Sequence, residues 1–454
     1  SNAVIGGSEG MGNVFSGNKG SNYYNELFID SYVFYNVNAQ YNSFDCLKNG
    51  TNIDPLRCFD LTNSTFRESQ IQNDAYVSVT GNNENDGLTP ATAFQTITHA
   101  LKMISLDSEE PVRIHLAPGT YSEATNGETF PIRIHSGISI IGANSDTTIL
   151  SVPELSSGFI AYYTLNTRLE NLTISGETAG SSTGIKCDKQ AYLEAVNCKM
   201  INLNNGLLCD NESFPAFSNC LFSRNQARGA IMIDSNPRFI DCTFSKNLGG
   251  GARGSEMPTF INCVFSSNQA DNGAGFDGTM AEFVECLFEN NTANESGGGL
   301  KVWGNFTVSN CSFVGNSATY GGAISCFHGS GGVINSCIIN NNAATDEGGG
   351  IYCVEESPIL MNNLIYSNTA DEGGGICTMT SNPEIINCTI TRNTAVSGGG
   401  IALREIPYTS PKEIKISNSI VYDNAPDAIS TLDQRVVASF SDIQGDYTGA
   451  GVIN

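Results

Sequence analysis

The chain has 454 residues, of which 48 are glycine and only 15% are charged. Its 46 acidic and 22 basic residues give a formal charge of −24, which argues against nucleic acid and anionic membrane surfaces as partners because both need a basic footprint. The sequence has no apolar run of about 18 residues, so no transmembrane helix is expected. We expect a monomer.

The first segment, residues 1–74, is polar, rich in Asn, Ser and Tyr, and has no clear period. We expect it to pack on the domain that follows. Ser1-Asn2-Ala3 resembles the remnant of a purification tag, so a signal peptide or lipid anchor before it would have been removed. Cys46 and Cys58 stand outside the regular cysteine spacing described below, and we predict a disulfide between them that closes a short loop.

The second segment, residues 75–160, contains a predicted helix between Pro90 and Ile104 whose apolar residues share one face. Thr89 before Pro90 suits an N-cap with Pro at the first helical position. We expect residues 75–454 to form one domain, in which this helix caps the open end of the first coil. Such a cap hides a strand edge that would otherwise aggregate.

The third segment, residues 161–425, repeats every 21 to 26 residues, with one longer final step. Each repeat has a Cys, a large apolar residue two positions later and an Asn five positions later. The first position is occupied by Cys198, Cys220, Cys242, Cys263, Cys286, Cys311, Cys337, Asn363, Cys388 and Ser419. The Asn position is occupied by Asn225, Asn247, Asn268, Asn291, Asn316, Asn342, Asn368, Asn393 and Asn424.

This period predicts an all-β fold, a parallel β-helix with one repeat per turn, which we call a rung. Residues two apart share one face of a strand, so the Cys and the apolar residue after it, such as Phe222, both face the interior. Rungs stack at about 4.8 Å, which turns equivalent residues into ladders. Asn side chains can then bond to each other and to the corner backbone. We interpret the cysteines as small buried thiols, because no CxxC pair indicates zinc.

Runs of glycine follow most of these Asn residues, as in "EGGGI" at Glu372–Ile376, because the chain turns where positive φ angles select glycine. A second cysteine ladder follows these corners, at Cys187, Cys209, Cys326 and Cys353. Cys377 falls one residue out of that ladder, so we expect it to face outward. Asp346 and Glu347 should stack on Asp371 and Glu372, either as exposed solubilising charge or as a weak cation site. Residues 426–454 form the expected C-terminal coil.

Two families resemble these segments. The repeats "FSRN", "FSKN" and "FSSN", alternating with "GGAI", are similar to those of bacterial polymorphic outer-membrane proteins, which build right-handed parallel β-helices on the cell surface. The stretch "GNNENDGLTPATAFQTITHAL" resembles the amino-terminal module of secreted proteins of the pectin-lyase-like superfamily. The resemblance implies a right-handed β-helix and an extracellular or cell-surface location, often with polysaccharide ligands. It transfers no activity by itself.

Outward residues of the strand after each glycine corner are the candidates for a metal site. Asp188, Asp210 and Asp234 would stand on consecutive rungs about 4.8 Å apart. Like charges at that spacing are unfavourable unless a cation joins them, and carboxylate oxygens suit Ca²⁺. The alternative interpretation is that each Asp makes a local turn bond and is screened by solvent.

The same wall carries further charged residues, three of them basic and one acidic. Lys186, Arg253, Asp277 and Lys301 take the position one residue after the strand start. Acids beside a Lys or Arg resemble the arrangement of pectate-lyase-like enzymes, in which Ca²⁺ neutralises a uronate carboxylate and a basic side chain removes the C5 proton. That resemblance implies catalytic roles for Lys186 and Arg253.

Trp303, the only tryptophan, would face outward beside Phe327. An indole there could support a sugar ring, with Asp277 and Lys301 beside it, or could pack beneath a loop. Two classes of function therefore remain. One is a non-catalytic module that binds polysaccharide or surface glycans, such as an adhesin. The other is a Ca²⁺-dependent uronate lyase that acts by β-elimination.

Overall fold

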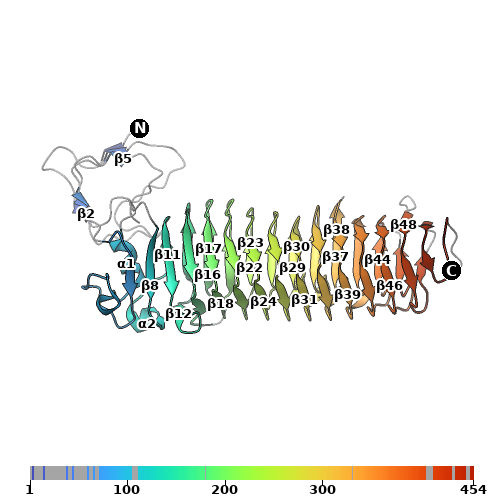
Figure 1. The fold of residues 1–454 in the computed structure, drawn as a ribbon, viewed down its shortest axis with the longest axis horizontal. Helices are drawn as coiled ribbons and strands as arrows, with labels where there is room; N and C mark the ends of the chain where they lie inside the picture. Colours follow the sequence, from blue (N-terminus) through green and yellow to red (C-terminus); the bar gives the residue numbers. More distant parts are fainter. Residues whose placement is uncertain are drawn as a thin grey trace.

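The computed structural model describes residues 71–104, 111–178, 180–329, 331–404, 413–431, 435–445 and 450–453, together with the backbone of six two-residue strands earlier in the chain. The described chain from residue 71 onward winds into an elongated parallel β-helix (Figure 1). No helix in these ranges is long and apolar enough to cross a membrane. The six early strands form two parallel sheets, from β1 (Ala3–Val4), β3 (Val37–Asn38) and β5 (Phe59–Asp60), and from β2 (Val14–Phe15), β4 (Ser43–Phe44) and β6 (Thr65–Phe66).

Three long parallel sheets form the walls of the helix. Wall 1 carries the strands after the glycine corners. Its strands are β10 (Ile132–Ile134), β13 (Ser157–Tyr162), β16 (Thr183–Asp188), β19 (Asn205–Cys209), β22 (Ala230–Met232), β25 (Ala252–Gly254), β29 (Phe276–Thr279), β33 (Leu300–Trp303), β37 (Ile324–Gly329), β41 (Ile351–Glu356), β44 (Ile376–Met379), β47 (Ile401–Arg404) and β50 (Ile429–Thr431).

Wall 2 precedes the cysteine corner of each rung. Its strands are β7 (Ala75–Val77), β8 (Val112–Leu116), β11 (Ile138–Gly142), β14 (Thr167–Glu170), β17 (Leu193–Val196), β20 (Ala216–Ser218), β23 (Arg238–Ile240), β26 (Thr259–Ile261), β30 (Glu282–Val284), β34 (Thr307–Ser309), β38 (Val333–Asn335), β42 (Ile359–Met361), β45 (Glu384–Ile386), β48 (Glu413–Ser417) and β51 (Arg435–Ser439).

Wall 3 follows the cysteine corner and ends at the Asn ladder. Its strands are β9 (Gly119–Tyr121), β12 (Thr148–Val152), β15 (Thr173–Gly176), β18 (Lys199–Ile201), β21 (Leu221–Ser223), β24 (Thr243–Ser245), β27 (Val264–Ser266), β31 (Leu287–Glu289), β35 (Ser312–Val314), β39 (Ile338–Asn340), β43 (Leu364–Tyr366), β46 (Thr389–Thr391), β49 (Ile420–Tyr422) and β52 (Asp442–Ile443).

A fourth, shorter parallel sheet lies between walls 3 and 1 in the middle of the molecule. It contains β28 (Gln269–Asn272), β32 (Thr292–Ser296), β36 (Ser317–Tyr320) and β40 (Ala343–Glu347), and we call it the lip sheet. The sequence pattern predicted only tight corners at these positions. The lip exists because these rungs carry a few more residues between the Asn and the glycine run.

The predicted aromatic ladder forms the core of wall 3. Adjacent rings from Phe222 to Phe313 lie nearly parallel, with centroid separations of 4.7, 4.8, 4.7 and 4.6 Å. A second aromatic ladder in wall 2, from Phe217 to Phe283, was not predicted and meets the first edge to face. Stacked and edge-to-face rings both place the positive edges and negative faces of the rings favourably.

The Asn ladder is confirmed in detail. Asn268, for example, is fully buried, and both its backbone N–H and its Nδ2 donate to Oδ1 of Asn291, at 3.1 and 3.0 Å. Its Nδ2 also donates to the carbonyl oxygen of Phe244 at 2.9 Å. Each side chain thus satisfies the buried backbone of its own corner and of a neighbouring rung, which an apolar residue could not do.

The thirteen described cysteines are buried free thiols, as predicted. Those of the corner ladder donate to backbone carbonyls; Cys242 Sγ, for instance, lies 3.3 Å from the oxygen of Ile240 and 3.5 Å from that of Phe217. Cys377 pairs in register with Tyr352 rather than with Cys353, so it faces outward as expected. The predicted pair Cys46 and Cys58 lies outside the described residues.

The capping helix is shorter than predicted. Thr89 caps a 3-10 turn at Pro90–Thr92 as expected, but the α-helix α1 covers only Ile97–Met103, with Thr96 as its N-cap. The prediction of one helix over Pro90–Ile104 was wrong because Phe94 forms a parallel bridge with Val77 and so extends wall 2. The short helix α2 (Glu123–Asn126) follows nearby, and Glu128 accepts hydrogen bonds from the first N–H groups of α1.

Candidate functional site: a basic groove beside the lip sheet

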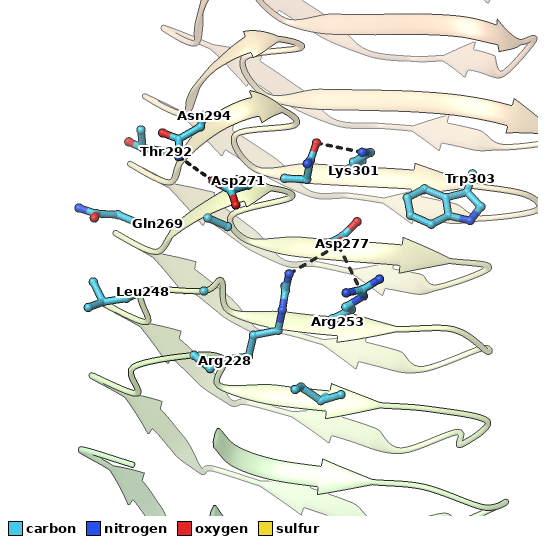
Figure 2. A pocket seen from close by; sticks show the side chains of 15 residues that line it. Arg228, Leu248, Arg253, Gln269, Asp271, Asp277, Thr292, Asn294, Lys301 and Trp303 are labelled. Atoms are coloured by element: carbon cyan, nitrogen blue, oxygen red, sulfur yellow. Dashed lines mark hydrogen bonds and ion pairs between the residues drawn. The ribbon is translucent and has the colours of Figure 1, made fainter. Parts of the chain in front are cut away.

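A groove of about 640 Å³ lies between the outward face of wall 1 and the lip sheet (Figure 2). Wall 1 contributes Arg253 from β25, Asp277 from β29, and Lys301 and Trp303 from β33. The lip contributes the stretch from Gln269 to Asn272, together with Thr292 and Asn294. Arg228 reaches in from the corner before β22.

Strand register brings these side chains together. Arg253 pairs with Asp277, and Asp277 pairs with Lys301, so the three form one outward column on consecutive rungs. Thr279, Trp303 and Phe327 form the neighbouring column. Because rungs are about 4.8 Å apart, residues more than 20 positions apart in the chain become nearest neighbours.

Asp277 is the central acid of the groove. Its Oδ2 lies 3.6 Å from Nη2 of Arg228 and 3.7 Å from Nε of Arg253, and its side chain is only 8% exposed. Its Oδ1 is buried without a hydrogen-bond partner among the described residues. Burial raises the pKa of Asp277, and the attraction of Arg228, Arg253 and Lys301 opposes that rise.

The two arginines differ in what they can do. Arg228 is largely buried, with 15% of its side chain exposed, and burial lowers its pKa. Arg253 is 59% exposed and points its guanidinium into the open groove. A guanidinium presents a fork of N–H donors that matches a carboxylate. Both arginines therefore pair with Asp277, but only Arg253 keeps most of its side chain accessible to an anionic ligand.

Lys301 is held by the lip and by aromatic rings. Its Nζ donates to Oδ1 of Asn272 at 2.9 Å, and it lies 5.7 Å from the ring centroid of Trp303 and 5.0 Å from that of Phe327. Trp303 is half-buried and lines the groove, which agrees with its predicted outward position. Phe327 does not line the groove and instead packs against Tyr352, with centroids 6.1 Å apart.

A glycine makes this close contact between lip and wall. Gly273 follows Asn272 and has a φ of +52°. A Cβ atom there would lie 2.3 Å from the carbonyl oxygen of Phe276 and 2.6 Å from Cβ of Asp277. Only a residue without a side chain allows the lip backbone to press on the strand that carries Asp277.

The three predicted metal-binding aspartates do not form one site. Asp188 is paired with Lys186, 3.6 Å away, and Asp210 accepts a hydrogen bond from the backbone N–H of Asn211. Within the described ranges, no group of three or more His, Cys, Asp or Glu side chains could hold a metal ion. These carboxylates are therefore not gathered into one cluster.

Placing Asp234 on this ladder was wrong. Register pairs Ala230 with Leu207 and Met232 with Cys209. Ile233 therefore follows Asp210, and Asp234 falls in the corner beyond it, with a φ of +47°. The prediction counted β22 from Ile231, and a shift of one residue moves a side chain to the other face of a strand.

Lys186 and Arg253 do not share a site either. Both belong to the same outward column, but β19 and β22 separate their strands, so they are about 14 Å apart along the axis. Leu208 and Ile231 fill the positions between them. The groove therefore contains Arg253, Asp277, Lys301 and Trp303 from the predicted set, and lacks Lys186.

The acids of the glycine corners stack as predicted, with Glu347 bridged to Glu372. Their interpretation as exposed charge was wrong for Glu347, whose side chain is only 4% exposed and forms an ion pair with Arg404. Arg404 also lies 3.1 Å from Glu372. Burial raises the pKa of Glu347, and Arg404 opposes the rise. A cation of the chain itself thus occupies the place proposed for a metal.

Sequence reasoning missed Arg228, Asp271 and Asn272. Arg228 lies in a corner rather than on a strand, so the outward-column pattern did not include it. Asp271 and Asn272 belong to the lip, where Asp271 accepts a hydrogen bond from Asn294 at 2.8 Å. The added length of the rung between Asn268 and Phe276 was the signal that could have indicated them.

Comparison with known families agrees with this architecture. A family model described as "Protein of unknown function (DUF1565)" matches residues 79–317, which is more than half of the chain. The chain belongs to the DUF1565 family. A second model, described as "Right handed beta helix region", matches residues 251–405, so this member of DUF1565 has the right-handed form of the solenoid.

No curated protein matches this DUF1565 chain. Solved structures that resemble it include the A-module of a mannuronan C-5 epimerase from Azotobacter vinelandii, with 11% identity, a TM-score of 0.46, and 75% of this chain and 90% of that chain covered. A GH136 lacto-N-biosidase from Eubacterium ramulus has 13% identity, a TM-score of 0.43, and coverage of 80% and 68%. A GH87 alpha-1,3-glucanase from Streptomyces thermodiastaticus has 14% identity, a TM-score of 0.41, and coverage of 76% and 64%.

Proposed function

We propose that this protein binds an acidic polysaccharide in the groove beside the lip sheet. The observation that carries the proposal is the exposed guanidinium of Arg253, 59% of whose side chain is accessible, in the same groove as Trp303. A uronate carboxylate would accept paired hydrogen bonds from Arg253. A neighbouring sugar ring would pack its apolar face on the indole.

The open shape of the groove favours a chain over a small molecule. It is bounded by a sheet and a lip and runs across several rungs, from Leu248 to Trp303. A non-catalytic role fits best, in which the regular rungs serve as a rigid support for the ligand. The proposal also places the protein outside the cell or on its surface, where such polysaccharides occur.

The test is a titration with a polyuronate and with a neutral polysaccharide, followed by the fluorescence of the single Trp303 and by calorimetry. We expect the polyuronate alone to bind. Arg253→Gln and Trp303→Ala should each weaken binding about tenfold or more, because anchors of this kind carry most of the affinity. Arg238→Gln, which removes an exposed arginine of wall 2, should bind like the wild type. Equal binding of the neutral polysaccharide would refute the proposal.

A uronate lyase is the alternative, favoured by the proximity of Arg253 to Asp277, whose pKa burial raises. A lyase would release unsaturated uronate products, which absorb in the ultraviolet. Product formation measured with and without Ca²⁺ would show whether the predicted ion takes part. If a polysaccharide binds tightly and no product forms, the lyase alternative is refuted and only the binding role remains.

A further inference from the structure

A nucleophile and an electrophile meet where the lip touches wall 1, and a buried acid stands beside them on the adjacent rung. The nucleophile is the amine of Lys301, whose Nζ lies 2.9 Å from Oδ1 of Asn272. The electrophile is the side-chain amide of Asn272. The acid is Asp277, the register partner of Lys301 on the adjacent strand. Nothing in the proposed binding of polysaccharide requires these three groups to be together.

We propose that Lys301 and Asn272 become joined by an intramolecular isopeptide bond, with Asp277 as the group that moves the protons. The bond would connect β33 of wall 1 to β28 of the lip sheet. It is a modification made by the chain on itself and needs no oxidant, cofactor or partner.

The reaction balances as a transamidation. Asp277 accepts a proton from the Lys301 ammonium, and the freed amine attacks Cγ of Asn272 while the carbonyl electrons move to Oδ1. The protonated Asp277 stabilises that oxygen and then passes its proton to Nδ2. The Cγ–Nδ2 bond breaks, ammonia leaves, and the new Cγ–Nζ amide remains. The attacking nitrogen loses its second proton as the amide forms, and the departing ammonia takes up that proton and leaves the chain as ammonium.

The surroundings of the three groups favour this reaction. The rings of Trp303 and Phe327 lie 5.7 and 5.0 Å from Nζ of Lys301, so aromatic surface borders the amine that reaches Asn272. Asp277 has one buried oxygen, Oδ1, without a hydrogen-bond partner among the described residues. A buried oxygen without a hydrogen-bond partner is unusual in a protein interior. Asp277 lines the same groove as Lys301 and Asn272.

The amide of Asn272 is also oriented for attack. Its Nδ2, the leaving group, donates to Oε2 of Glu295 at 2.9 Å, while its Oδ1 accepts from Lys301. Gly273 lets the lip backbone approach so closely that an added Cβ would lie 2.6 Å from Cβ of Asp277. The electrophile is therefore held next to the strand that carries the acid, which is the preorganisation such a reaction needs.

The bond would fasten the lip across 29 positions of the chain. It would remove the positive charge of Lys301 and leave Arg253 as the exposed cation of the groove. The two proposals can fail separately. The isopeptide bond is detected from the mass of the protein without any ligand, and polysaccharide binding is measured by titration, which does not depend on that mass.

Intact mass spectrometry of the purified protein tests the bond. The wild type should be about 17 Da lighter than its sequence predicts, the mass of one ammonia lost when the amine becomes acylated. Tandem spectra should show a branched peptide joining Asn272 to Lys301. Lys301→Arg and Asp277→Asn should both restore the full sequence mass. Lys186→Arg, a lysine of the same outward column, should retain the loss.

Two results would overturn the proposal. One is a wild-type mass equal to that of the sequence, which decides the matter even if the variants fail to fold. The other is a mass loss that persists in Lys301→Arg, because Asn272 followed by Gly273 can also lose ammonia by cyclising on its own backbone. A melting temperature lower in Lys301→Arg than in Lys186→Arg would further support a covalent link.

Discussion

At the scale of single residues, each ladder position requires a particular chemical group. The cysteine corner needs a short side chain that both donates to a carbonyl and accepts from a neighbouring rung. Asn363 and Ser419 take that position in two rungs, and they accept from the backbone N–H of Cys337 and Cys388 at 2.8 and 3.0 Å. The buried thiols are therefore weak hydrogen-bonding groups of the core.

The Asn ladder makes a prediction at this scale. Asn268→Ala should lower the free energy of unfolding by about 2–4 kcal/mol, because buried polar groups left without partners cost about 1–3 kcal/mol each. The change removes the bonds of Nδ2 to Phe244 and Asn291 and leaves two donors of Asn247 without their acceptor. Urea denaturation measures the difference.

The adjacent Gln269 is exposed and provides the control. Gln269→Ala should change the free energy of unfolding by no more than about 0.5 kcal/mol, as is usual for surface substitutions. A similar effect of both variants would show that the buried ladder does not stabilise the corner.

At the scale of elements, the lip sheet determines which outward residues of wall 1 are enclosed in a groove. Where the lip is present, side chains that point away from the core are covered again: Asp277 and Tyr352 are both buried. Ion pairs and ring contacts join the two sheets, including Glu347 with Arg404 and Tyr320 stacked on Tyr352 at 5.4 Å. Near β16, where no lip strand is described, Lys186 is partly exposed, with 32% of its side chain accessible.

Gly273→Ala tests the contact between lip and wall. The added methyl group would collide with Phe276 and Asp277, in a backbone conformation of positive φ that alanine adopts at a cost. We expect the unfolding free energy to fall by about 2 kcal/mol or more and polyuronate binding to weaken, as measured by calorimetry. Gly137→Ala is the matched control, since Gly137 has a φ of +74° but no atom within 4 Å of the added Cβ. Unchanged binding in Gly273→Ala would show that the lip does not shape the groove.

At the scale of the whole molecule, each rung contacts mainly its neighbours, so stability is close to a sum of local contributions. The middle rungs stack two Phe ladders, whereas β52 at the C-terminal end has only two residues. Hydrogen exchange should therefore be slowest for the amides of β24, β27 and β31 and fastest for β51 and β52, as measured by mass spectrometry of peptides. Uniform protection along the axis would mean that the solenoid unfolds as a single unit.

The sequence by itself determined the architecture. Each residue of a ladder contacts the residue at the same position in the next rung. The regular spacing of Cys, Phe and Asn therefore predicts which residues touch and which chemical groups they bring together. The strand register, the core and the hydrogen bonds at the corners all follow from that spacing. The capping turn at Thr89 was predictable because a cap is a local interaction. The break in the helix was not predictable, because Phe94 pairs with Val77 of another strand, which is not a local interaction.

Only the tertiary structure decided the site. The repeat period predicted the column of Arg253, Asp277 and Lys301. How deeply these side chains are covered depends on the lip sheet. The lip brings Asn272 to Lys301, and its residue Glu347 is buried. Placing Asp234 required the register of β22 to within one residue, and a hydrophobic period cannot distinguish Ala230 from Ile231 as the strand start. Burial, unpaired oxygens and pKa values depend on what covers a side chain, and in this protein the cover comes from segments of irregular length between the repeats.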